Sequence, residues 1–158
     1  MNVRYVPQGK NQCGQACVSV LLDGISLDES ASLIGRKTYT RAKDLDRGLR
    51  KGSKGKMRLG PRRSGGPPLN GGFGVWLVAV KIRPGRNWHW ALLRLNGLDV
   101  EMVWPTMYPQ HILGYSATER TSDSYNTAWS SRWKITQSYR IEGLRREFKH
   151  ERHSRANE

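Results

Sequence analysis

The chain of 158 residues carries 27 Lys and Arg against 13 Asp and Glu, which gives a formal net charge of +14. This length suits one domain of ordinary size. The longest apolar run, Val75–Val80, has six residues, which excludes a membrane-spanning helix. The N-terminus lacks the apolar core of a signal peptide, so we expect a cytoplasmic protein. Two cysteines, Cys13 and Cys17, are too few for a disulfide framework.

The first elements expected along the chain are two helices. Residues 13–23 place small and apolar side chains on one face at helical spacing, and Gly24 ends the pattern. Ser26 followed three residues later by Glu29 is typical of a capped helix start. The second helix is therefore predicted to be short and to end at Gly35.

A third helix and a long loop are expected next. The helix begins at Thr40 and turns Leu45 and Leu49 to its inner face. Residues 51–74 contain eight Gly and three Pro, a composition that predicts a loop without regular elements.

Strands dominate the second half of the chain. Residues 75–82 and 88–95 are apolar strand patterns, and Asn96-Gly97 is a strong hairpin signal that leads into a partner strand at 98–103. A last strand is expected at 132–141. Helices followed by antiparallel strands predict an α+β fold. We expect one domain over residues 1–141, followed by a charged helix or tail at 142–158.

The residues around Cys13 are the strongest candidates for chemistry. Cys13 lies at a predicted helix start, where unpaired amides and the helix dipole favour a thiolate. Gly14 would let a substrate approach the backbone, and Gln8 offers an amide donor to an oxyanion. His89, on a strand between two tryptophans, is the best candidate for a base. Three further histidines are weaker candidates: His111, His150 and His153.

These motifs resemble those of the papain-like cysteine peptidases. The resemblance rests on Pro7-Gln8, on Cys13-Gly14-Gln15-Ala16-Cys17 and on Trp88-His89-Trp90, and it covers about Val3 to Pro105. The branch that the chain resembles most is that of the bacteriocin-leader (double-glycine) peptidase domains. It implies N-terminal helices packed on an antiparallel sheet, within the α+β class.

The resemblance also implies roles for particular residues. Cys13 would be the nucleophile, His89 the general base, and Gln8 an oxyanion donor together with the Cys13 amide. Gln8 lies five residues before Cys13, where the family usually has six, so Gln12 is a competing candidate. Cys17 is expected to be a core thiol. No cofactor is expected, and the cysteine and histidine spacing matches no zinc pattern.

The hairpin departs from the family at the residue that orients the histidine. With Asn96-Gly97 as the turn, Trp104 stands opposite His89, where the family has Asp or Asn before a proline. Asp99 and Glu101 fall on the other face of the sheet, because side chains alternate along a strand. A cysteine–histidine pair without a third member can still react, because the third residue orients the base and does not attack.

Two functions follow as hypotheses. The first is hydrolysis of an amide, peptide or isopeptide, with deamidation and acyl transfer open to the same groups. Because Arg47–Leu98 holds twelve basic and no acidic residues, an acidic peptide or protein is the expected substrate. The alternative is an inactive domain that binds an acidic protein or a nucleic acid, although no nucleic-acid-binding motif is present. Its candidate basic loop comprises Arg50, Lys51, Lys54, Lys56, Arg58, Arg62 and Arg63.

Overall fold

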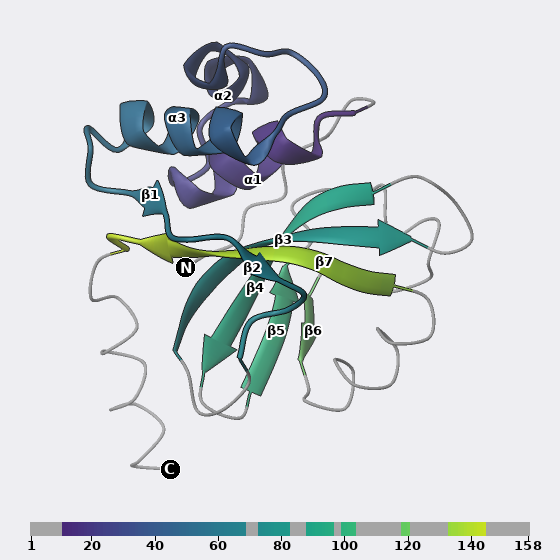
Figure 1. The fold of residues 1–158 in the computed structure, drawn as a ribbon. Helices are drawn as coiled ribbons and strands as arrows, with labels where there is room; N and C mark the ends of the chain where they lie inside the picture. Colours follow the sequence, from purple (N-terminus) through teal and green to yellow (C-terminus); the bar gives the residue numbers. More distant parts are fainter. Residues whose placement is uncertain are drawn as a thin grey trace.

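Three helices lie together on one side of an antiparallel sheet (Figure 1). The computed structural model describes residues 11–68, 73–82, 88–96, 99–103, 118–120 and 133–144. The helices are α1 (Cys13–Leu21), α2 (Leu27–Ile34) and α3 (Ala42–Gly52). The strands are β1 (Arg58–Leu59), β2 (Arg63–Ser64), β3 (Phe73–Ile82), β4 (Trp88–Asn96), β5 (Asp99–Val103), β6 (Thr118–Arg120) and β7 (Trp133–Glu142). The α+β class predicted from the sequence is therefore confirmed.

The ends of the first two helices follow the predicted signals. After α1, Gly24 adopts a φ of 77° and its N–H donates to the Ser19 carbonyl at 2.8 Å. At the start of α2, the Ser26 hydroxyl accepts the Glu29 N–H at 3.1 Å, and the Glu29 carboxylate accepts the Ser26 N–H at 3.2 Å. Gly35 ends α2 with a φ of 80°, a left-handed conformation that glycine adopts at little cost.

Helix α3 begins two residues later than predicted, at Ala42 rather than Thr40. The reason is local: the Asp44 carboxylate accepts the Arg41 N–H at 2.9 Å, which satisfies an amide that precedes the first helical turn. Leu45 and Leu49 are fully buried, as the spacing predicts.

The sheet has β3, β4 and β7 at its centre. Its order is β1-β7-β3-β4-β5-β6, with β2 also paired to β7, and every pair is antiparallel. The four predicted strands are confirmed to within about two residues at their ends, an agreement typical of boundary assignments. The short strand β6 had no counterpart in the prediction.

The prediction of a structureless loop at 51–74 is wrong in part. Helix α3 continues to Gly52, β3 begins at Phe73, and the two-residue strands β1 and β2 lie between them. Both pair with β7, whose ten residues offer backbone groups along an edge that must be satisfied. Two glycines extend this pairing: Gly60 N–H donates to the Arg140 carbonyl at 2.8 Å, and Gly65 N–H to the Thr136 carbonyl at 3.0 Å. Composition misses such short strands because backbone pairing needs no side-chain pattern.

The predicted register between β4 and β5 is wrong by two residues. Asn96 pairs with Asp99, so the connecting residues are Gly97 and Leu98 rather than Asn96 and Gly97. The predicted register would have set Leu92 opposite Glu101. The observed one sets Leu92 opposite Val103 and Arg94 opposite Glu101. The observed register thus sets Leu92 opposite an apolar residue, whereas Arg94 stands opposite an acidic residue in either register, so the observed alignment is the more favourable one.

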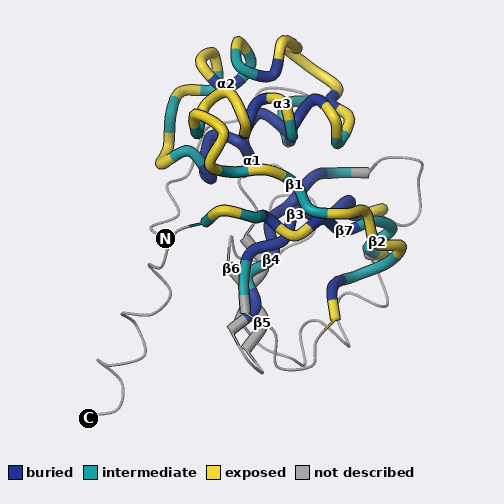
Figure 2. Tube along the Cα trace, turned by 60° about the vertical axis from the view of Figure 1, so that its left-hand side comes forward, coloured by how far each residue is buried: buried dark blue, intermediate teal, exposed yellow. Residues whose placement is uncertain are grey.

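The core lies between the helices and the central strands. One buried cluster contains residues from α1, α3, β3, β4 and β7, namely Cys17, Leu45, Leu77, Leu92 and Tyr139. It therefore packs the helices against the central strands. The opposite side of the same strands is also buried, as the burial colours along β3 and β4 indicate (Figure 2). Strands buried on both faces explain why the sequence reads as continuous apolar runs rather than as an alternating pattern.

Candidate functional site

Cys13 is the first residue of α1 and touches strand β4. The rest of α1, from Gly14 to Leu21, is buried, whereas Cys13 is half-buried. Its Sγ accepts a hydrogen bond from the backbone N–H of Trp90, with a sulfur–nitrogen distance of 3.5 Å. These two residues lie 77 positions apart in the sequence. The fold therefore brings the candidate nucleophile to the residue that follows His89.

The thiol meets β4 at a point where the described part of β5 has ended. The described β5 pairs with β4 from Leu92 to Asn96 and reaches no nearer to Trp90. Backbone N–H groups of a strand point sideways in the plane of the sheet. Cys13 Sγ therefore lies beside the edge of β4, where side chains from either face of the strand can flank it.

The side chains of His89 and Trp90 lie on opposite faces of β4. Trp90 is 3% exposed and belongs to the cluster beneath the helices. His89 pairs with Val80 on β3 and is half-buried. Because side chains alternate along a strand, the His89 side chain lies on the face of β4 opposite Trp90.

Burial opposes charge on both candidate groups. Burial raises the pKa of the Cys13 thiol, and the backbone N–H groups of Trp90, Gly14 and Cys13 itself offset part of that rise. Burial also lowers the pKa of the His89 imidazole. Both directions favour the neutral form of the group concerned. Desolvation thus opposes the thiolate that the helix start was expected to favour, and its effect on the thiol pKa exceeds that of the amides.

The loop before α3 packs against Trp90 and Gly14, two residues whose backbone N–H groups are directed at the Cys13 thiol. The indole Nε1–H of Trp90 donates to the Thr40 carbonyl at 3.1 Å. Thr40 also packs on Gly14: a Cβ at that position would overlap the Thr40 hydroxyl and lie 2.9 Å from Leu45 Cδ2. The small size of Gly14 therefore serves close packing inside the fold, where the sequence had suggested room for a substrate.

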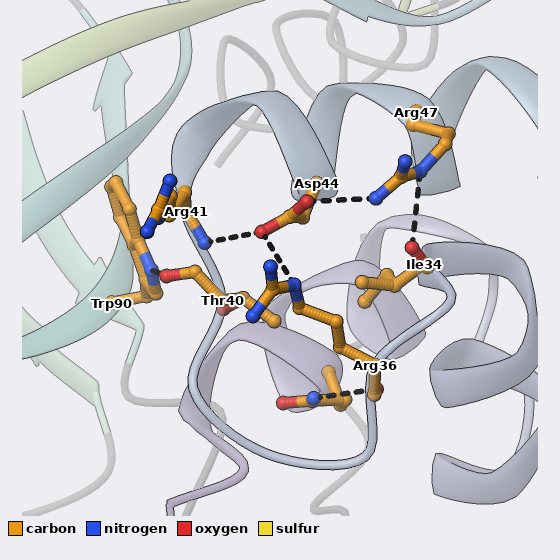
Figure 3. A network of polar contacts seen from close by, with 8 residues as sticks. Ile34, Arg36, Thr40, Arg41, Asp44, Arg47 and Trp90 are labelled. Atoms are coloured by element: carbon orange, nitrogen blue, oxygen red, sulfur yellow. Dashed lines mark hydrogen bonds and ion pairs between the residues drawn. The ribbon is translucent and has the colours of Figure 1, made fainter.

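Asp44 holds this loop in place (Figure 3). Its buried carboxylate accepts the Arg41 N–H at 2.9 Å and forms ion pairs with Arg36 at 3.3 Å and Arg47 at 2.7 Å. Arg47 also donates to the Ile34 carbonyl at 3.1 Å, at the last residue of α2. One carboxylate thus ties the segment before α3 to the end of α2.

The glutamine candidates have different outcomes. Gln12 Nε2 donates to the Lys37 carbonyl at 3.4 Å, so its amide is directed at the loop after α2. Gln15 is fully buried, and its Nε2 donates to the Arg36 carbonyl at 2.9 Å. Gln8 lies outside the described residues, and the prediction for it remains a prediction.

Several other candidates also lie outside the described residues, namely Trp104, His111, His150 and His153. Asp99 pairs with Asn96 and Glu101 with Arg94 in the backbone register of β4 and β5. Cys17 is fully buried within the core, as predicted.

All seven cations of the predicted basic loop belong to exposed residues, and two of them form ion pairs. Arg50 forms an ion pair with Asp46 at 2.8 Å, and Arg58 with Glu142 at 2.7 Å. The remaining five are Lys51, Lys54, Lys56, Arg62 and Arg63.

Sequence reasoning missed Thr40 and Asp44 as parts of the site's surroundings. Neither residue marks itself as part of a reactive site in the sequence. The contact of Thr40 with Trp90, for example, joins residues 50 positions apart. The only signal available was Asp44 at the start of a helix, where a carboxylate accepts backbone amides.

The described residues 11–68, 73–82, 88–96, 99–103, 118–120 and 133–144 contain no group of three His, Cys, Asp or Glu side chains suited to a metal ion. None of the helices within that part of the chain is long and apolar enough to cross a membrane. Comparison of the chain with protein-family models and with curated protein sequences finds no match.

Proposed function

We propose that the chain is a cysteine peptidase-like hydrolase of papain-like fold that cleaves an amide bond through Cys13 and His89. The observation that carries the proposal is the 3.5 Å contact between Cys13 Sγ and the backbone of Trp90, the neighbour of His89. A thiol at a helix start beside a histidine on a strand is the arrangement that thiol nucleophiles use.

The electrostatics favour a general-base form of this chemistry. His89, kept neutral by its lowered pKa, takes the thiol proton as Cys13 sulfur attacks the carbonyl carbon. The tetrahedral intermediate expels the amine, which takes that proton from His89 and leaves a thioester. Water then attacks the thioester while His89 accepts its proton. The acid is released, and the proton returns to the sulfur.

Backbone amides at the start of α1 suit the developing oxyanion. The first backbone hydrogen bond of α1 runs from the Ala16 N–H to the Gln12 carbonyl, at 3.0 Å. The amides of Cys13 and Gly14 precede that bond and are directed toward Cys13 Sγ. Gln8 remains the proposed side-chain donor, and an acidic peptide or protein the proposed substrate.

The first test is the rate at which iodoacetamide alkylates Cys13 as the pH is raised. Because burial raises the thiol pKa, the thiolate fraction should still be rising at alkaline pH, above the point where an ordinary cysteine levels off. Near neutral pH, where His89 acts as base, the His89→Ala variant should label more slowly by about tenfold or more.

Two variants make this measurement specific. Cys13→Ala should abolish the labelling, and Cys17→Ala should leave it unchanged because Cys17 is fully buried. Equal labelling rates with and without His89 would refute the proposed pair. A substrate screen with acidic peptides then follows, in which His89→Ala should lower kcat/KM by about 10²–10⁴.

A binding protein is the second candidate, favoured by the exposed cations at and after the end of α3. Helix α3 has eleven residues and begins beside Thr40, so its far end lies roughly 15 Å from the thiol region. Lys51 lies in the last turn of α3, Lys54 and Lys56 follow the helix, and all three residues are exposed. A polyanion bound there would need no reactive thiol.

Salt dependence tests this second candidate. Binding of a duplex oligonucleotide and of polyglutamate is measured at increasing salt, with Lys51, Lys54 and Lys56 changed to Gln. Loss of these cations should weaken binding and flatten the salt dependence. The matched control changes Arg50 and Arg58 to Gln, whose charges are already paired with Asp46 and Glu142. Equal losses in the two sets would argue against this surface.

A further inference from the structure

Tyr39 is the one large hydrophobic side chain that is exposed among the described residues, with 70% of its surface open to solvent. It belongs to the loop between α2 and α3, in which residues 35–39 are all exposed. Single exposed aromatic residues are common on protein surfaces and need a second observation before they mean anything.

The second observation is backbone strain at the same residue. Tyr39 has a φ of +30°, a conformation that a bulky L-residue adopts rarely and at a cost. Glycine would adopt it freely. Tyr39 therefore has two unfavourable features, an aromatic ring exposed to water and a strained backbone conformation.

The third observation is that the loop is fastened to the thiol's own surroundings. Tyr39 N–H donates to the Asn11 carbonyl at 3.2 Å, two residues before Cys13. The next residue, Thr40, accepts the indole N–H of Trp90 and packs on Gly14. The strained residue thus lies between anchors on both sides of Cys13, one before α1 and one on β4.

Side chains of α1 and α3, together with Gln12, also hold this loop, so its conformation is preorganised for a ligand. Gln12 and Gln15 donate to the carbonyls of Lys37 and Arg36, and Asp44 binds the Arg36 side chain. Rigid display of a side chain lowers the entropy lost on binding. Strain that the surrounding contacts maintain is typical of ligand-contacting positions.

We propose that Tyr39 is the specificity-determining residue of the Cys13 site, and that its ring packs on a large apolar or aromatic side chain of the substrate peptide beside the amide under attack. This inference rests on the proposed function. An exposed tyrosine offers a flat apolar face with only two side-chain torsions to fix, which suits such a contact.

Peptidyl chloromethyl ketones test the inference, because the Cys13 sulfur displaces chloride and reports recognition without turnover. Two reagents are compared on the full chain, one with Phe and one with Gly next to the reactive ketone. Each rate constant is divided by the same variant's iodoacetamide rate. The wild-type chain should prefer the Phe reagent by about tenfold or more.

Three variants decide whether the preference comes from Tyr39. Tyr39→Phe should keep the preference, and Tyr39→Gly should lose it while unfolding at no lower temperature, because glycine relieves the strain. Thr38→Ala, an exposed change in the same loop, should keep it.

The failures of the two proposals are distinguishable. Iodoacetamide labelling that ignores His89 contradicts the Cys13–His89 pair, whatever the ketones do. Labelling that depends on His89, combined with no Phe preference or with a preference that survives Tyr39→Gly, overturns the role of Tyr39 alone.

Discussion

Replacing Gly14 with alanine is the sharpest test of the packing around the thiol. The added methyl would overlap the Thr40 hydroxyl and lie 2.9 Å from Leu45 Cδ2. The Thr40 Cβ would also lie 3.1 Å from the added methyl, and the Thr40 backbone is held in place because its carbonyl accepts the buried indole N–H of Trp90 at 3.1 Å. Leu45 is fully buried in the core. We therefore expect Gly14→Ala to destabilise the fold rather than to block a substrate.

The magnitude follows from two opposing effects. Overpacking a close-packed core costs about 1–3 kcal/mol, and two clashing partners place this site at the upper end. Alanine gains up to about 1 kcal/mol over glycine inside a helix. The net loss is therefore about 2 kcal/mol, and for a domain of this size that lowers Tm by roughly 4–8 °C.

Thermal and urea denaturation of Gly14→Ala measure this loss. The matched rescue is Gly14→Ala combined with Thr40→Ala, which removes the clashing hydroxyl but keeps the Thr40 carbonyl for Trp90. The double variant should lose less than the sum of the two single variants, by about 1 kcal/mol. Full stability of Gly14→Ala, combined with weaker substrate binding, would refute this reasoning and restore the idea of a backbone opened to substrate.

Three further changes probe neighbouring contacts. Asp44→Asn should cost roughly 1–2 kcal/mol in urea denaturation, because it removes charge-assisted bonds to Arg36 and Arg47, whose side chains are about half exposed. A loss of stability that does not shrink at high salt would argue against ion pairing. Trp90→Phe should cost about 1–3 kcal/mol in urea denaturation by leaving the Thr40 carbonyl unpaired, and a neutral result would show that this bond adds nothing. Ser26→Ala should cost about 1 kcal/mol through loss of the cap, and a neutral result would show that the cap adds nothing here.

The helices were predictable because their signals are local. Ser26, Glu29 and Gly35 act within a few residues of the ends that they define, so the sequence alone places α2. The register of β4 and β5 was not predictable from the turn residues. Asn-Gly and a following Gly-Leu both offer a glycine to a two-residue connection. What decided between them was the pairing of Leu92 with Val103 along the whole ladder.

The candidate site shows the same division between local and long-range information. Residue types were enough to select Cys13 and His89, since few groups in a protein can attack a carbonyl or accept a proton. Their protonation states were not, because the helix start argues for a thiolate and burial argues for a neutral thiol, and the sequence gives the first effect but no measure of the second.

Tyr39 extends that argument to recognition. In the sequence it is one of six tyrosines, with nothing to distinguish it from a core residue. Its exposure, its positive φ and the carbonyl of Asn11 that holds its amide come only from the folded chain. A reactive residue can thus be proposed from its chemistry, whereas a residue that selects the substrate is recognised by where the fold holds it against its own preference.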